Sequence, residues 1–125
     1  MPVPILKQGD CRIASIQSAL TDADMLDLRD ELSDRVGRFR SKGVIIDVTV
    51  LDVLDSFASR TLRTISQMVR LRGAETVIVG IQPEVAFSMV QLGLSLDGVT
   101  TVLDLEEGLV HLERSRRARA ARAGG

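Results

Sequence analysis

Residues 43–70 read GVIIDVTVLDVLDSFASRTLRTISQMVR, and this stretch decides the fold. Residues 44–46 form a β-branched apolar run that is typical of a parallel strand buried on both faces. Two acidic residues, Asp52 and Asp55, follow the run. From Ser56 onward, apolar residues recur every three or four positions, which predicts an amphipathic helix. A buried strand that leads through a short loop into a helix is the repeating unit of an α/β fold.

The same unit repeats along the rest of the chain, after a short hairpin. Strands are predicted at residues 4–7, 11–16, 44–48, 76–79 and 100–103. Helices are predicted to begin after the capping residue Thr21, at Asp55 or Ser56, at Pro83 and after Asp104. The order β-β-α-β-α-β-α-β-α predicts a mixed, mostly parallel sheet with helical cover.

Periodicity also predicts which residues of each helix face the core. The apolar positions are Met25, Leu28, Leu32, Val36 and Phe39 in the first helix and Ala58, Leu62, Ile65 and Val69 in the second. They are Val85, Ala86, Met89 and Val90 in the third helix and Leu105, Leu109 and Leu112 in the last. Because only 2% of the residues are aromatic, we expect an aliphatic core.

The length of 125 residues predicts one domain. We place this domain at residues 1–112 and a basic tail at residues 113–125, which we expect to be a helix extension or disordered. The tail contains five Arg and one Glu, whereas the formal net charge of the whole chain is -1. The body is therefore acidic, and charge is unevenly distributed along the chain.

The chain lacks the residue sets that catalysis and cofactor binding require. His111 is the one histidine, and no nucleophile elbow precedes it, so the sequence shows no serine-type triad. Cys11 is the one cysteine, and no Cys/His group has the spacing of a metal site. No glycine-rich phosphate-binding motif occurs. We therefore expect a protein that is not an enzyme and that uses no cofactor or metal. A single cysteine, no secretory start and no membrane-length apolar stretch predict a cytoplasmic protein.

The start of the second helix carries the candidate site. One interpretation is that Asp55 and Ser56 simply cap the helix. Ser56 also begins a row of polar side chains on one helix face, and this row comprises Ser56, Arg60, Arg63, Gln67 and Arg70. Such a row is either an ordinary solvated face or a docking surface. A phosphate on Ser56 would change the charge of that surface, close to the carboxylates of Asp52 and Asp55.

Two further hydroxyl groups lie near Ser56 in the sequence. Ser59 follows three residues later, and Thr49 lies where the preceding strand ends. We rank Ser56 above both as a phosphorylation site. The predicted partner-binding surface comprises Asp52, Asp55, Ser56, Ser59, Arg60 and Arg63.

Five segments resemble those of a known family: residues 3–7 (VPILK), 43–47 (GVIID), 53–57 (VLDSF), 80–86 (GIQPEVA) and 103–109 (LDLEEGL). The chain resembles the STAS domain of anti-sigma factor antagonists, and among them the RsbS-type scaffold proteins of bacterial stressosomes. The resemblance implies a single α/β domain whose mixed sheet has an N-terminal hairpin and about four helices, packed mainly on one face.

The resemblance also implies a function. In RsbS-type proteins, the serine at the position of Ser56 accepts phosphate from an RsbT-type serine/threonine kinase. The unphosphorylated scaffold, with RsbR-type paralogues, holds the kinase in a large assembly, and phosphorylation releases it to start a general stress response. An RsbX-type phosphatase resets the state. The resemblance thus implies self-association and these three protein partners, and no membrane contact.

Other functions are considered beside this one. The first is a simple antagonist that binds an anti-sigma kinase and so frees a sigma factor. The second is a nucleic-acid binder that uses the basic tail, which the acidic body and the scarcity of aromatic side chains disfavour. The third is an enzyme with an unrecognised site, which the missing residue sets disfavour further.

Overall fold

The order of strands and helices predicted from the sequence is confirmed by the computed structural model, which describes residues 3–124. The strands are β1 (Ile5–Gln8), β2 (Cys11–Ser15), β3 (Gly43–Asp47), β4 (Glu75–Val79) and β5 (Thr100–Val102). The helices are α1 (Asp22–Phe39), α2 (Ser56–Leu71), α3 (Pro83–Gln91) and α4 (Leu105–Gly124). Within residues 3–124, no helix has a stretch long and apolar enough to cross a membrane.

The five strands form one sheet in sequential order, β1-β2-β3-β4-β5. β1 pairs with β2 in antiparallel fashion, and the remaining pairs are parallel. The register aligns Ser15, Asp47, Val79 and Val102, so that β2 to β5 all end at the same edge of the sheet. We call this the carboxyl edge. The loop that leads from each parallel strand into the next helix lies there.

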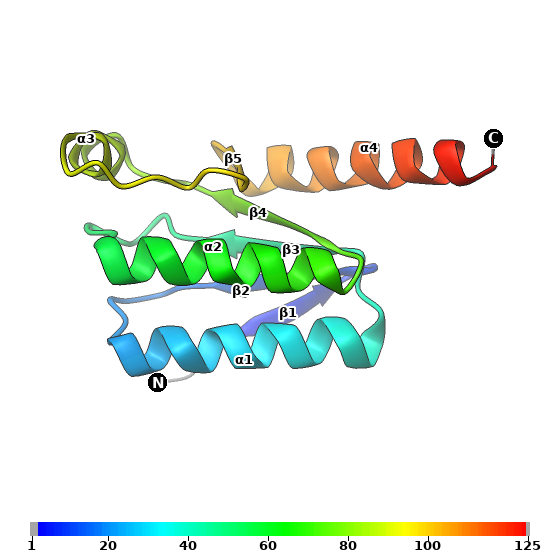
Figure 1. The fold of residues 1–125 in the computed structure, drawn as a ribbon, viewed down its shortest axis with the longest axis horizontal. Helices are drawn as coiled ribbons and strands as arrows, with labels where there is room; N and C mark the ends of the chain where they lie inside the picture. The colour runs from blue at the N-terminus through cyan, green and yellow to red at the C-terminus, as the bar shows by residue number, and fades with distance from the viewer. Residues whose placement is uncertain (1–2, 125) are drawn as a thin grey trace.

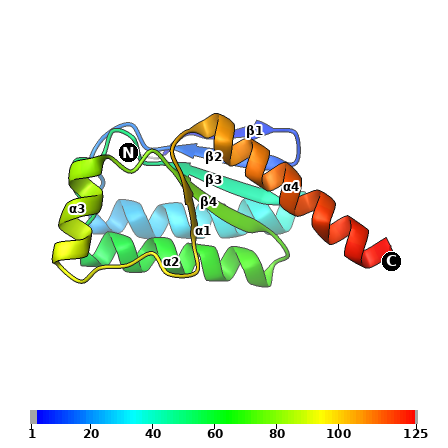
Figure 2. The ribbon, with the colours of Figure 1, turned by 90° about the horizontal axis from the view of Figure 1, so that it is seen from above.

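The two faces of the sheet are covered by different helices (Figures 1 and 2). The larger core lies under α1 and α2, where Ile46 packs with Leu32 and Leu62, and two residues of α3, Val85 and Met89, join it. The smaller core lies on the opposite face under α4, and its buried residues are Cys11, Ile13, Ile45, Val77, Val79 and Leu112. Three helices therefore contribute to one face and α4 covers the other.

Some residues predicted to face the core are exposed instead. Phe39, at the end of α1, is 52% exposed, and its ring lies 4.6 Å from the Arg12 guanidinium carbon. Arg12 is buried, and its Nε donates a hydrogen bond to Ser41. Phe39 thus covers a buried cation rather than the aliphatic core. In the nine-residue helix α3, Val85 and Met89 are buried, whereas Ala86 and Val90 are exposed.

Polar contacts also hold α4 to the sheet. Nε2 of His111 lies 2.6 Å from Oε2 of Glu75, and the Thr100 hydroxyl donates to the same oxygen at 3.2 Å. Partial burial raises the pKa of Glu75, but hydrogen bonds from His111 and Ser115 and the charge of His111 outweigh it. The net effect lowers the pKa of Glu75 below its ordinary value of 4.5. The ionised carboxylate therefore stabilises the folded state.

We predict that Glu75→Gln destabilises the protein in a pH-dependent manner. A lowered folded-state pKa contributes stability that is complete above the ordinary pKa and is lost as the pH falls through the folded-state value. The difference in unfolding free energy between wild type and Glu75→Gln should therefore shrink as the pH falls from about 6 to about 3. Urea unfolding at a series of pH values measures it. A difference that stays constant would contradict the role of the charged carboxylate.

Candidate functional site

Ser56 is the first residue of α2, and its hydroxyl is available. Asp55 caps the helix, because its carboxylate accepts a hydrogen bond from the backbone N–H of Ala58 at 2.8 Å. Ser56 is exposed, and among residues 3–124 its side chain has no hydrogen-bond partner. The capping interpretation is therefore correct for Asp55 alone. The neighbouring serine is left free for other chemistry.

The electrostatic surroundings of Ser56 have two opposing parts. The first N–H groups of a helix, here those of Ser56 and Phe57, have no partner within the helix and favour a nearby negative group. The exposed carboxylates of Asp52 and Asp55 repel a negative group at the same place. A phosphate on Ser56 would therefore sit between a favourable helix terminus and two repelling charges. The added charge would change this surface strongly.

Hydrogen bonds to Thr49 from two sides fix the start of the loop that leads from β3 to Ser56. Oδ1 of Asp47 accepts hydrogen bonds from the backbone N–H and the hydroxyl of Thr49, at 2.9 and 2.6 Å. The side-chain amide of Gln82 donates to the Thr49 carbonyl at 2.7 Å. Gly80, at a φ of 83°, approaches so closely that an added Cβ would lie 2.0 Å from the Thr49 hydroxyl. The turns after β3 and β4 are thereby locked together.

An apolar groove runs beside Ser56 at the carboxyl edge. It lies between the loop after β2 and the loop after β3, and it is lined by Ala19, Leu20, Asp22, Met25, Val50, Leu51, Asp52, Val53, Leu54, Asp55 and Ala58. Val50 and Val53 are 50% and 70% exposed. These two valines lie in a loop, outside any periodic pattern, so the sequence does not predict their part in the site. Exposed valines beside a free hydroxyl form a surface suited to a protein partner.

The structure corrects the role predicted for Ser59. Its side chain is 1% exposed and faces the interior, and its Oγ has no hydrogen-bond partner among the described residues. The prediction that Ser59 lies on the partner-binding surface is therefore wrong. Thr49 is exposed, but its hydroxyl donates to Asp47. Ser56 is the one of the three hydroxyl groups that is both exposed and without a hydrogen bond among residues 3–124.

The row of arginines on α2 divides into two kinds. Arg63 donates to the carbonyl of Ser95, and Arg70 donates to the carbonyl of Gly98 at 2.7 Å. Both side chains therefore hold the loop between α3 and β5, and the predicted docking role of Arg63 is replaced by a structural one. Arg60, one turn from Ser56, is exposed and has no ion pair within residues 3–124. It is the cation of the row that can respond to a phosphate.

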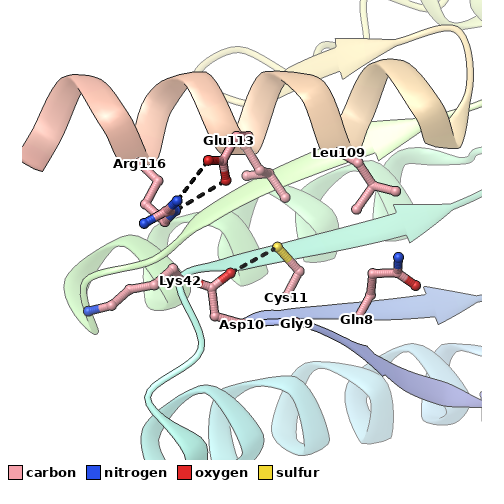
Figure 3. A pocket seen from close by; sticks show the side chains of 9 residues that line it. Gln8, Gly9, Asp10, Cys11, Lys42, Leu109, Glu113 and Arg116 are labelled. Carbon is pink, nitrogen blue, oxygen red and sulfur yellow. Dashed lines mark hydrogen bonds and ion pairs between the residues drawn. The ribbon is translucent and has the colours of Figure 1, made fainter.

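A second hollow, at the opposite edge of the sheet, lies between the β1–β2 turn and α4 (Figure 3). Two of its charged groups are already engaged, since Arg116 pairs with Glu113 at 2.7 Å. Burial and the adjacent Asp10 raise the pKa of the Cys11 thiol to about 11, so the thiol stays protonated and unreactive near neutral pH. No group of His, Cys, Asp and Glu in the described part of the chain could hold a metal ion.

The family model of the STAS domain matches residues 3–108. The chain belongs to the STAS domain family. Its similar proteins include an RsbS protein, a chain from a study of the stressosome and RsbT co-antagonist proteins.

Two solved structures resemble the chain over nearly its whole length. A serine-to-glutamate variant of Moorella thermoacetica RsbS is 36% identical, with a TM-score of 0.79 over 92% of this chain and 97% of that one. A chain from a study of the molecular architecture of the stressosome is 37% identical, with a TM-score of 0.76 over 91% of this chain and 99% of that one.

A curated relative extends the comparison. The RsbT co-antagonist protein RsbRA of Bacillus subtilis is 35% identical over 82 residues, which cover 66% of this chain. The matched segment makes up only 30% of RsbRA, so the chain corresponds to less than a third of that relative's length.

We predict that Gly80→Ala destabilises the fold and loosens the loop before Ser56. The substitution places a side chain in the left-handed region, which costs about 1–3 kcal/mol, and also displaces Thr49. Gly98→Ala is a matched control, since Gly98 has a φ of 82° and open space around its Cβ position. Urea unfolding should show a larger loss for Gly80→Ala. Equal losses would show that the Thr49 contact is unimportant.

Proposed function

We propose that this chain is a non-catalytic scaffold of a stressosome, which sequesters an RsbT-type serine/threonine kinase and releases it when Ser56 is phosphorylated. The observation that carries the proposal is the free, exposed Ser56 hydroxyl at the start of α2, beside an apolar groove. The similarity to RsbS over nearly the whole chain supports it.

The groove explains how a phosphate could release a partner. A kinase that covers Val50 and Val53 would bury apolar surface and exclude water from the neighbouring Ser56. A phosphate there carries a charge between about -1.5 and -2 at neutral pH, and burying it under a partner is unfavourable. The interface would therefore lose affinity while the STAS fold stays intact. No bistable element within the domain is required.

The proposal includes the wider assembly. We infer that RsbR-type paralogues share the scaffold, that the chain associates with itself, and that an RsbX-type phosphatase removes the phosphate. The similarity to a stressosome chain and to RsbRA supports a shared assembly. The output would be a general stress response in the cytoplasm.

The second candidate is a simple antagonist that binds an anti-sigma kinase and frees a sigma factor. It uses the same serine and the same groove, so the site geometry does not separate the two. The assemblies differ, because a scaffold forms a very large complex with its paralogues and a simple antagonist remains small. Sedimentation of the chain mixed with an RsbR-type paralogue distinguishes them.

We predict that the cognate kinase with ATP modifies Ser56, and that the charge on this residue controls kinase binding. Ser56→Asp should weaken capture of the kinase, because it adds negative charge beside the groove. Ser56→Ala should retain the kinase in the presence of ATP, because no phosphate can be added. Mass-spectrometric mapping and a pull-down measure both effects.

Two variants make this experiment specific. Gln67→Glu adds one negative charge to the same helix, three turns from Ser56, and should leave capture unchanged. Ser59→Ala removes the buried hydroxyl and should leave the mapped site unchanged. Phosphate found on Ser59 or Thr49 in place of Ser56, or equal capture by Ser56→Asp and Ser56→Ala, would overturn the proposed switch.

We also predict that Arg60→Ala alters the response to phosphorylation more than Arg72→Ala does. Arg60 lies one turn from Ser56, where its guanidinium can pair with the phosphate. The ratio of kinase affinities before and after phosphorylation should change by up to about fivefold, since exposed ion pairs contribute about 0.2–1 kcal/mol. The Arg72 side chain packs against Gly37 at the far end of α2, so its removal can destabilise the fold. The unfolding midpoint of the Arg72→Ala variant is therefore measured as well. Equal responses from two folded variants would argue against a role for Arg60.

A further inference from the structure

The last half of α4 carries concentrated positive charge. Residues 114–124, which we call the arginine tail, contain five Arg and no acidic residue. Figures 1 and 2 show that α4 continues past the sheet, with its last turn far from the other helices. The apolar residues of the tail are all alanines, so it has no apolar stripe that would pack on a core or insert into a membrane.

Most of this charge is unpaired within the molecule. Glu113 forms ion pairs with Arg116 and Arg117. The other three, Arg114, Arg119 and Arg122, have no ion pair among residues 3–124. Arginines three positions apart on a helix repel each other, as Arg116 and Arg119 do here. An acidic surface placed against the tail would relieve this repulsion.

The carboxyl edge is such an acidic surface. Residues 16–27, 47–59, 80–94 and 102–108 form its loops and the first turns of its helices, and α3 lies at this end in both overall views. These segments hold ten of the 17 acidic residues of the chain and none of its 16 Lys and Arg. We call this surface the acidic edge.

The tail and the acidic edge cannot meet within one molecule, because they lie at opposite ends of it (Figure 1). We propose that the arginine tail of one copy docks on the acidic edge of a second copy of this chain. The net charge of only -1 means that two copies do not repel each other overall. The acidic body opposes the approach of a nucleic acid, whereas a second copy offers a complementary surface.

This contact joins two different surfaces, so it repeats from copy to copy and yields chains or rings. It goes beyond the kinase proposal, because it is present without phosphate or kinase. Each exposed ion pair contributes little, so association is weak and strongly weakened by salt. The contact is lost where the screening length falls from about 30 Å in 0.01 M salt to about 3 Å in 1 M salt.

The test is sedimentation velocity on the unphosphorylated full chain at high protein concentration. In low salt the average mass should rise with concentration by about twofold or more, with no stop at a dimer, and high salt should reverse it. Replacing Arg114, Arg119 and Arg122 together by Glu should abolish the rise. Replacing the same three by Lys conserves the charge and should preserve it.

A charge exchange identifies the docking surface. A variant with Asp22, Glu84 and Glu106 replaced by Lys should associate much less by itself, because the formal charge of its edge falls from -10 to -4. The tail variant with Glu keeps an unchanged acidic edge, but its tail is no longer basic. Mixing the two folded variants should restore association, since the unchanged tail of one variant then meets the unchanged edge of the other. Circular dichroism confirms that each variant is folded.

Two outcomes would overturn the proposal. One is a mixture of folded variants that stays monomeric while the wild type associates. The other is a wild type that stays monomeric in low salt at high protein concentration. If that wild type binds a labelled DNA duplex through the tail, the tail is assigned to nucleic acid instead. Loss of association by the tail variant leaves kinase capture at Ser56 intact, so the two proposals fail separately.

Discussion

The parallel pairing of β3 with β2 on one side and with β4 on the other is the constraint on which the rest of the structure depends. Its register aligns the ends of four strands, so every strand-to-helix loop is delivered to one edge. β3 is covered on both faces, by Ile46 toward α1 and α2 and by Ile45 toward α4. The position of Ser56 follows from this register. The chain leaves β3 at this edge and, after a short loop, begins α2 at Ser56.

A common edge also brings together the helix starts and the residues that cap them. Thr21, Asp55 and Asp104 each accept a hydrogen bond from a first-turn N–H, at 3.1, 2.8 and 2.9 Å. Capping is a structural requirement, and acidic residues at these positions need no functional explanation. Ser56 is different, because Asp55 already satisfies the helix terminus. The adjacent hydroxyl makes no contribution to the cap, which leaves it free for the phosphorylation proposed above.

The sequence predicted those features that depend on local chemistry and on strong periodicity. The β3 run, the cap at Asp55 and the buried Leu62, Ile65 and Val69 of α2 are all of this kind. Predictions failed where a distant segment decides the environment. Arg63 was predicted to lie on the partner-binding surface, but its partner is a carbonyl 32 residues away in the same chain. Phe39 fits the helical period, yet α1 ends there and the ring meets Arg12 instead of the core.

Helix electrostatics account for only part of the charge distribution. The helix dipole favours cations within the last turn, and Arg122 is the one arginine that lies in the last turn of α4. Arg114 and Arg119 lie farther back, where the dipole offers little, and they have no acidic partner on the described surface. Acids at the carboxyl edge stabilise helix starts, whereas these two arginines form no ion pair within residues 3–124. Their charge is complementary to the edge that holds Ser56, and the proposed contact between copies would use it.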